Sequence, residues 1–183
     1  MEILNDFDVS VRKAFSEIDP EWELYDGLVV AGTHNPHDVS NTLEKIRLAR
    51  ETSRPFLGIC MGLQLMVIEY ARNVLGIKDA TSEELGAGTH VVVKMPELRV
   101  GIFPVDNRQE SHWHNYKVNN DYIEKFEGYA VTMTGDVLEE LCNRNMVGIQ
   151  YHPEYQSSKD KPHRLLKLFI EQCKKYTKLI PVV

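Results

Sequence analysis

Two short runs of apolar residues, each bounded by turn-forming residues, predict buried strands of a parallel sheet. They cover residues 27–31 (GLVVA) and 55–59 (PFLGI), and their length suits strands that are buried on both faces. The segment between them, residues 40–52, has the composition and capping residues of a helix. The second run leads directly into MGLQLMVIEYARNVLG, whose length requires a helix that ends near Gly76. This order of strand, helix, strand and helix is typical of a parallel sheet with crossover helices.

The remainder of the chain predicts helices at both ends and strands in the middle. Apolar positions at helical spacing predict helices over residues 7–18 and about 162–175. Between residues 88 and 150, short apolar segments predict several strands: THVVVKMPE and LRVGIFPV on either side of Pro96, then YAVTMT, VLEELC and MVGIQ. We therefore predict an α/β fold, a mostly parallel sheet with flanking helices and an antiparallel β insertion, in a single domain over residues 1–183.

Length and composition narrow the class of protein. The 183 residues are enough for one core, and 43% hydrophobic with 26% charged residues is a globular composition. A net charge of −6 argues against nucleic acid or an anionic membrane as the partner. No apolar run approaches the roughly 18 residues of a membrane span, and the acidic start MEILNDFDVS does not resemble a signal peptide. Three scattered cysteines (Cys60, Cys142 and Cys173) favour reduced thiols, so we expect a cytoplasmic protein.

Cys60 has the sequence context of a nucleophile. It lies at the centre of Gly58-Ile59-Cys60-Met61-Gly62, where a buried strand is predicted to turn into a helix. Glycines at these two positions allow the sharp turn of a nucleophile elbow, which exposes the central side chain at the carboxyl end of the sheet. The helix N-terminus there stabilises a thiolate, and the N–H of Met61 is left to bind an oxyanion. The alternative is a structural thiol, because free cysteine is often buried.

A histidine and a glutamate follow the last predicted strand. In Gln150-Tyr151-His152-Pro153-Glu154, the imidazole of His152 can act as a general base and Glu154 can orient it. Cys60 and His152 are 92 residues apart, so only the fold can bring them together. The alternative is a histidine and a glutamate in a solvent-exposed loop.

These motifs resemble the class I glutamine amidotransferases, and most closely the glutaminase domain of CTP synthases. The resemblance is strongest in RPFLGICMGLQLMVIEYARNVLGIKDATSEE and VGIQYHPEY, and it extends over most of the chain. It implies a flavodoxin-like fold and a triad in which Cys60 attacks the carboxamide of glutamine, His152 relays a proton to ammonia, and Glu154 orients His152. It also implies an oxyanion hole and a substrate site, formed by Met61, Gly32 and Thr33 and by Gln64, Glu84, Asn115 and Tyr116.

Three features depart from that family pattern. Thr33 stands where the family has a glycine, and a β-branched side chain resists positive φ, which weakens the case for an oxyanion hole. Asn115 stands where the family has an arginine for the carboxylate of the substrate, so the substrate need not be glutamine. Only residues 1–4 precede the first predicted helix, and EIDPEWELYDG replaces the second strand of the family. This indicates a smaller sheet or a missing natural beginning.

The expected activity is that of an amidohydrolase for glutamine or a related γ-glutamyl amide, without a cofactor. The sequence lacks a Walker-type phosphate-binding run, so the ammonia acceptor would be a synthetase partner in trans, such as a CTP-synthase-like one. Two alternatives stay open: a catalytically impaired relative that acts as a regulatory or binding module, and a hydrolase for a different acyl substrate. His112 and His114 could share one side of a strand as metal ligands, but no third ligand lies nearby in sequence. We therefore expect no metal, and we interpret the pair as a polar rim of the pocket.

Overall fold

A computed structural model describes residues 1–5, 7–36 and 38–179 of the chain. Its main sheet has six strands in the order β1-β2-β3-β9-β8-β7. The first four are parallel, whereas β8 is antiparallel to β9 and β7 is antiparallel to β8. Their bounds are β1 Glu2–Leu4, β2 Leu28–Val30, β3 Phe56–Ile59, β9 Met146–Ile149, β8 Val137–Cys142 and β7 Ala130–Thr134. The predicted α/β class with a mostly parallel sheet is confirmed.

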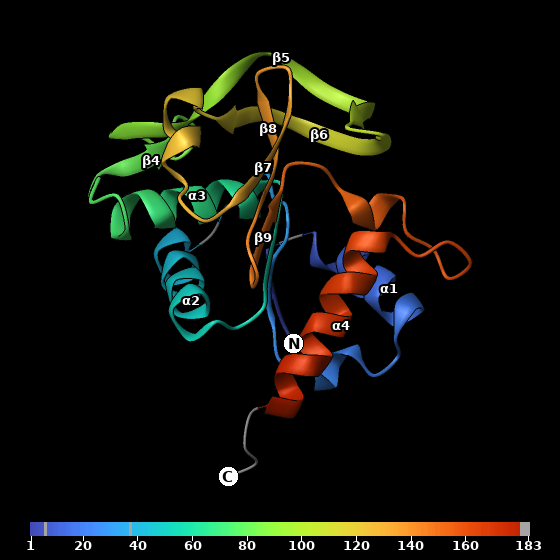
Figure 1. Cartoon of the computed structure of the whole chain (residues 1–183). Coiled ribbons are helices and arrows are strands. Elements are labelled where there is room, and N and C mark those ends of the chain that lie inside the picture. Colours follow the sequence, from blue (N-terminus) through green and yellow to red (C-terminus); the bar gives the residue numbers. More distant parts are fainter. Residues whose placement is uncertain (6, 37, 180–183) are drawn as a thin grey trace.

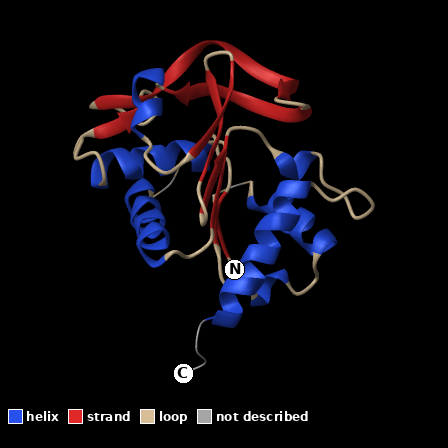
Figure 2. Ribbon diagram, viewed as in Figure 1, coloured by secondary structure: helices blue, strands red, loops and turns tan. Residues whose placement is uncertain are grey.

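Helices cover both faces of this sheet. In Figure 1 the sheet is seen nearly edge-on, with α2 and α3 on one side and α1 and α4 on the other, and Figure 2 shows the same layers by type of element. The helices span α1 Asp8–Ile18, α2 Val39–Thr52, α3 Met61–Asn73 and α4 Arg164–Leu179. All four were predicted, and their crossover connections explain why the central strands are parallel.

A second sheet lies across the carboxyl ends of the parallel strands (Figure 1). It has the order β4-β5-β6, with β4 Ala80–Ser82, β5 Thr89–Val105 and β6 Arg108–Val118. The two strands predicted on either side of Pro96 are one strand, β5, whose register against β6 shifts between Lys94 and Arg99. The predicted antiparallel insertion is therefore divided, because β5 and β6 form a sheet of their own while β7 and β8 extend the main sheet.

The start of the chain adds a short strand to the sheet. Residues 2–4 form β1, in which Ile3 pairs with Val29 of β2. Between α1 and β2 the described residues contain no strand but a 3-10 turn, η1, over Trp22–Leu24. The ring of Trp22 is 2% exposed and packs edge-on against Phe15, with 5.4 Å between centroids. Burial of this large ring stabilises the 3-10 turn, because the ring would not reach the same position from an extended strand.

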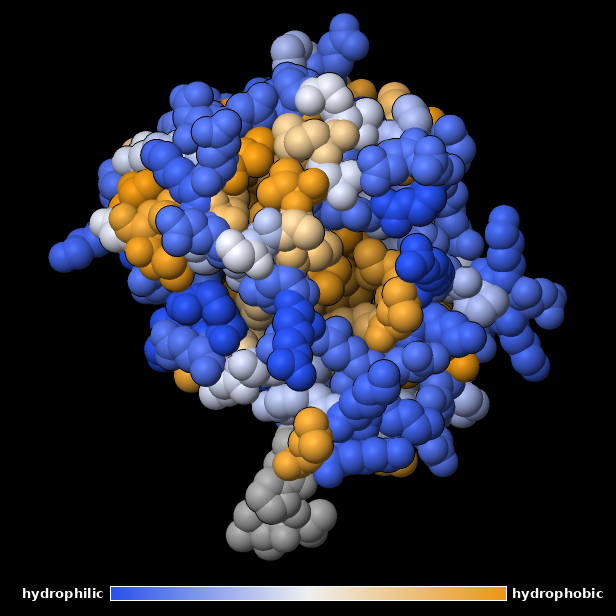
Figure 3. Space-filling model, viewed as in Figure 1, coloured by the Kyte–Doolittle hydropathy of each residue, from blue (hydrophilic) through white to orange (hydrophobic). Residues whose placement is uncertain are grey.

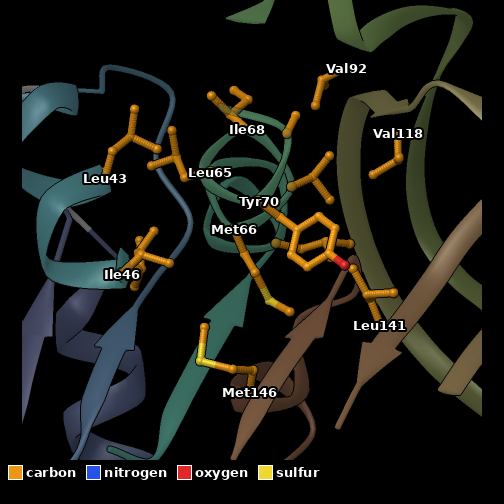
Figure 4. Close-up of a cluster of buried hydrophobic side chains, with 14 of the residues drawn as sticks. Leu43, Ile46, Leu65, Met66, Ile68, Tyr70, Val92, Val118, Leu141 and Met146 are labelled. Atoms are coloured by element: carbon orange, nitrogen blue, oxygen red, sulfur yellow. The ribbon is translucent and has the colours of Figure 1, made fainter. Parts of the chain in front are cut away.

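Apolar side chains form a core on each face of the main sheet. The cluster between the sheet and helices α2 and α3 is shown in Figure 4, where Met66, Tyr70 and Met146 fill the space between helix and strands. Every residue from Met61 to Ala71 of α3 is buried, because this helix lies between the main sheet, α2 and the second sheet. Figure 3 shows that the viewed surface is mostly hydrophilic, with hydrophobic residues gathered near its middle. Within the described ranges, no helix has the length and hydropathy to cross a membrane.

Candidate active site

Cys60 lies at the junction of β3 and α3 with a left-handed backbone, φ 54° and ψ −104°. A non-glycine residue rarely adopts positive φ, so the turn is held in place by its surroundings. A Cβ atom added to Gly58 would lie 2.5 Å from the carbonyl carbon of Gly62, and one added to Gly62 would lie 2.0 Å from the carbonyl oxygen of Val30. Both positions therefore require glycine for space. This is the backbone geometry expected of the predicted elbow.

Two polar groups flank the sulfur of Cys60. Nε2 of the buried Gln150 donates a hydrogen bond to Sγ at 3.7 Å, and Sγ in turn lies 3.8 Å from the carbonyl oxygen of Trp113. Cys60 is 8% exposed and stands at the N-terminal end of α3, where the helix dipole favours negative charge. The other two cysteines differ from Cys60 in their surroundings. Burial raises the pKa of Cys142 and of Cys173 to about 12, so both thiols stay protonated at neutral pH.

His152 and Glu154 lie together at the end of β9. Nδ1 of His152 is 2.7 Å from Oε1 of Glu154, and both side chains are buried. The imidazole stacks on the ring of Tyr155, with 4.9 Å between centroids and 8° between planes. Burial lowers the pKa of His152, but its interactions with Cys60 and Glu154 outweigh burial and raise it to about 10. These buried groups are not in solvent, so the alternative of an exposed loop histidine is wrong.

The loop after β2 completes the surroundings of Cys60. A Cβ atom on Gly32 would lie 2.9 Å from Cε1 of His152 and 3.0 Å from Cδ2 of Phe7, so this residue must be a glycine. Thr33, in contrast, is not among the described residues with positive φ, and its Oγ1 accepts a hydrogen bond from the N–H of Asn35 at 3.0 Å. The threonine is thus accommodated without a left-handed backbone. Met61 begins α3, where its N–H has no acceptor within the helix.

A single pocket brings most of the predicted site residues together. It opens in front of Cys60, and its wall includes these predicted residues: Thr33, Met61, Gln64, Glu84, Asn115 and Tyr116. The remaining lining residues are Phe7, His34, Leu98, Trp113 and His114. His152, Glu154 and Gly32 are not in the wall but directly behind it, around Cys60.

Sequence reasoning did not place the rings of Phe7 and Trp113 in this pocket. The ring of His34 lies 5.3 Å from Phe7 and 5.3 Å from Trp113, measured between centroids, and Phe7 lies 6.2 Å from His152. These rings come from three segments that are far apart in sequence. The sequence held one local signal for Trp113. It lies between His112 and His114 on a strand, and successive side chains of a strand point to opposite faces.

His112 and His114 form a buried pair, 2% and 4% exposed, of which His114 lines the pocket. Nδ1 of His112 lies 3.2 Å from Nε2 of His114, whose Nδ1 lies 2.9 Å from the carbonyl oxygen of Tyr116. Of the pair interpreted as a polar rim, His114 lies in the pocket wall, whereas His112 lies behind it, with Nε2 3.8 Å from Oε2 of Glu139. Among the described residues, no group of three or more potential ligands is placed to hold a metal ion.

Comparison with known proteins identifies the family. The model of the family described as "Glutamine amidotransferase class-I" matches residues 4–172. A CTP synthase of Methanoculleus marisnigri is 36% identical over 180 residues, which cover 82% of this chain and 34% of that protein. A CTP synthase of Ruminiclostridium cellulolyticum is 31% identical over 211 residues, covering 94% of this chain and 40% of the relative. The chain thus spans about a third of the length of such relatives.

Solved structures agree on the fold. The glutaminase domain of the Trypanosoma brucei CTPS, with bound acivicin, superposes with a TM-score of 0.81 at 22% sequence identity, covering 95% of this chain and 92% of that one. A putative GMP synthase component from Thermoplasma acidophilum superposes with a TM-score of 0.60 at 16% identity, covering 97% of this chain and 95% of that one. With the family model matching nearly the whole described chain, the protein belongs to the class I glutamine amidotransferases.

Proposed function

We propose that this protein is a thiol-dependent amidohydrolase that converts the side-chain carboxamide of a glutamine group to a carboxylate and ammonia. The observation that carries the proposal is that Cys60, on its positive-φ turn in the pocket wall, interacts with the buried His152, which in turn pairs with Glu154. A nucleophile beside a base that a third group orients is the arrangement that acyl transfer requires.

In the proposed reaction, the thiolate of Cys60 attacks the carboxamide carbon and a tetrahedral intermediate forms. His152, protonated as an imidazolium, gives its proton to the nitrogen as the carbon–nitrogen bond breaks, and ammonia leaves. Water then attacks the thioester with His152 as general base, releasing the carboxylate and the thiol. Glu154 is a positioning residue, since it acts on the substrate only through His152.

The negative charge of the tetrahedral intermediate would be stabilised by backbone N–H groups. We assign this role to Met61, at the N-terminus of α3, together with Gly32 and Thr33 in the loop after β2. The backbone of Thr33 supports this assignment, because it lies outside the left-handed region that a β-branched residue resists. Substrate contacts are assigned to Gln64, Glu84, Asn115 and Tyr116, which share the pocket wall.

Ammonia release from L-glutamine and L-glutaminamide tests the proposal. We expect release that falls to background in Cys60→Ala and persists in Cys142→Ala, the matched control for loss of a thiol. Release from neither substrate, or release that survives in Cys60→Ala, would overturn the proposed mechanism. Far-ultraviolet circular dichroism of both variants verifies that they are folded.

A second candidate is a glutaminase that supplies ammonia to a synthetase in trans. The curated relatives favour it, because they carry the name CTP synthase. It predicts free glutamine as the preferred substrate, and turnover that rises when a CTP-synthase synthetase domain is added with UTP and ATP. A preference for a different glutamine derivative contradicts this candidate and leaves the amidohydrolase chemistry intact.

A further inference from the structure

Among the described residues, the wall of the pocket holds one unpaired carboxylate and no lysine or arginine. Glu84 is the only carboxylate among its lining residues, and none of those that the structure describes is a lysine or an arginine. Burial is the one influence on the Glu84 carboxyl, and it raises its pKa. No salt bridge joins this carboxylate to any described cation. The Glu84 carboxylate is therefore free to form an ion pair with a cationic group of a ligand.

Gln64 lines the same pocket, but its amide oxygen is closed off from it. The residue is 2% exposed, and its Nε2 donates to the carbonyl oxygen of Tyr116 at 3.4 Å. Reversing the amide would place its oxygen against the carbonyl of Tyr116, so this orientation is the favourable one. Its Oε1 is buried and has no hydrogen-bond partner in the described structure, so a ligand can reach this oxygen only if the side chain moves. The partly exposed Glu84 is therefore the group that can pair with a donor on a ligand.

The lysine and arginine side chains of β5 and β6 that are nearest to the pocket either form ion pairs with other residues or do not line it. Arg99 binds Oε1 of Glu139 at 2.7 Å, and the ammonium of Lys117 pairs with Asp136. Lys94 pairs across the sheet with Tyr116 but is exposed and does not line the pocket. Burial lowers the pKa of His114 to about 4, so this lining imidazole is neutral at pH 7. None of these groups is placed to pair with the carboxylate of a bound amino acid.

Aromatic and aliphatic side chains form two other parts of the pocket. Toward His152, the rings of Phe7, His34 and Trp113 pack together. At the mouth, alternate residues of β5 expose apolar side chains on one face: Leu98, Val100 and Ile102 are 60%, 53% and 56% exposed. Leu98 lines the pocket itself, so the apolar stripe runs outward from its edge.

We propose that the substrate is a glutaminyl group with a free α-amine and an amidated α-carboxyl, as at the N-terminus of a peptide. This inference rests on the amidohydrolase chemistry proposed above and names its substrate class. Glu84 pairs with the ammonium group, and the amidated carboxyl brings no negative charge to a wall whose described residues include no lysine or arginine. The following residue lies along the stripe that begins at Leu98. The carboxamide reacts with water at Cys60, leaving an N-terminal glutamate and ammonia.

Four substrates test this assignment: L-glutamine, L-glutaminamide, glutaminyl-leucinamide and N-acetylglutaminamide. Ammonia release is measured with Cys60→Ala as the blank, because an N-terminal glutamine also loses ammonia by cyclising. We expect kcat/KM for glutaminyl-leucinamide to exceed that for free glutamine by about 10- to 100-fold, with no detectable turnover of the acetylated compound. Faster hydrolysis of free glutamine overturns the inference and leaves the amidohydrolase function standing. Cys60-dependent release from none of the four overturns both.

Placing a cation in the pocket wall provides the matched test. Asn115→Arg adds a guanidinium to a lining position, and we expect it to shift the ratio of the two kcat/KM values toward free glutamine by about 10-fold or more. Lys94→Gln, which removes a cation outside the pocket, should leave that ratio unchanged. If Lys94→Gln selectively abolishes turnover of free glutamine, Lys94 is the carboxylate partner and the inference is wrong.

Discussion

Nδ1 of His112 donates a hydrogen bond to Nε2 of His114, at 3.2 Å, in the buried space between β6 and the main sheet. The direction follows from the next contact, because Nδ1 of His114 faces a carbonyl oxygen, which can only accept. Nε2 of His112 then carries a lone pair and lies 3.8 Å from Oε2 of Glu139. Neither of these two atoms has another hydrogen-bond partner among the described residues.

We expect the two histidines to make the stability of the protein depend on pH. Burial lowers the pKa of His112 to about 3 and of His114 to about 4, from 6.5. Below pH 6.5 both imidazoles bind a proton in the unfolded chain but stay neutral in the folded one. The free energy of unfolding therefore falls as the pH falls toward 4. The expected slope is about 1 kcal/mol per pH unit or more.

Urea denaturation at several pH values measures this slope, and the variant His112→Gln/His114→Gln should flatten it. Other charged groups face the pair: Arg99 and His152 strengthen the lowering of the histidine pKa values, whereas burial raises the pKa of Glu139 and opposes the slope. An unchanged slope in the double variant would show that the pair does not titrate as described.

Alkylation should distinguish Cys60 from the other two cysteines. Burial raises the pKa of Cys142 and Cys173 to about 12, so both are almost entirely protonated at neutral pH. Cys60 stands at a helix N-terminus in the pocket wall. We expect iodoacetamide to modify Cys60 at least about 10-fold faster than either of the others at pH 7. Peptide mapping by mass spectrometry measures the three rates, and comparable rates would contradict the assignment of Cys60 as the reactive thiol.

Glu154→Gln should lower turnover and move its alkaline limit. The carboxylate of Glu154 is among the groups that raise the pKa of His152, so its removal lowers that pKa and the imidazolium is lost at a lower pH. We expect kcat to fall about 100-fold or more, with the alkaline limb of the pH–rate profile displaced toward neutrality. A fall in kcat without any displacement would mean that Glu154 does not act through the protonation of His152. The melting temperature verifies the fold of the variant.

A buried ion pair between α2 and α3 should contribute strongly to stability. Nη2 of Arg50 lies 2.7 Å from Oε1 of Glu69, whose side chain is 1% exposed. Arg50→Met leaves the buried carboxylate of Glu69 without its cationic partner, and we expect a loss of about 3–5 kcal/mol in the free energy of unfolding. Arg50→Met/Glu69→Leu should recover most of the loss, because no charge then remains buried.

The exposed pair of Arg47 and Glu51 on α2 provides the control for that ion pair. Arg47→Ala should lower the free energy of unfolding far less than Arg50→Met does, because water screens an exposed ion pair. Urea denaturation compares the three variants. An Arg50→Met variant as stable as Arg47→Ala would show that solvent reaches Glu69.

The sequence by itself determined the elements whose cause is local. Apolar runs between turn residues identified β2 and β3. Helical spacing identified α1 and α4, capping residues identified α2, and the length of its segment identified α3. The glycines around Cys60 predicted its sharp turn, since Gly58 and Gly62 have no space for a side chain. Local signals were misleading where a distant contact prevailed. Pro96 suggested a break in what is one strand, because pairing with β6 resumes beyond it, and a buried ring turned the segment around Trp22 into a 3-10 turn.

Only the tertiary structure decided what the pocket presents to a ligand. Residues from separate segments meet there: Phe7, His34 and Trp113 form the ring cluster, and Gln64 and Glu84 line the same pocket. The sequence contains these residues but not their proximity, because contacts between distant segments depend on how β5 and β6 are laid over the carboxyl ends of the parallel strands. Local propensity selects helices, strands and turns, whereas the charges and acceptors that face a substrate depend on which elements pack together.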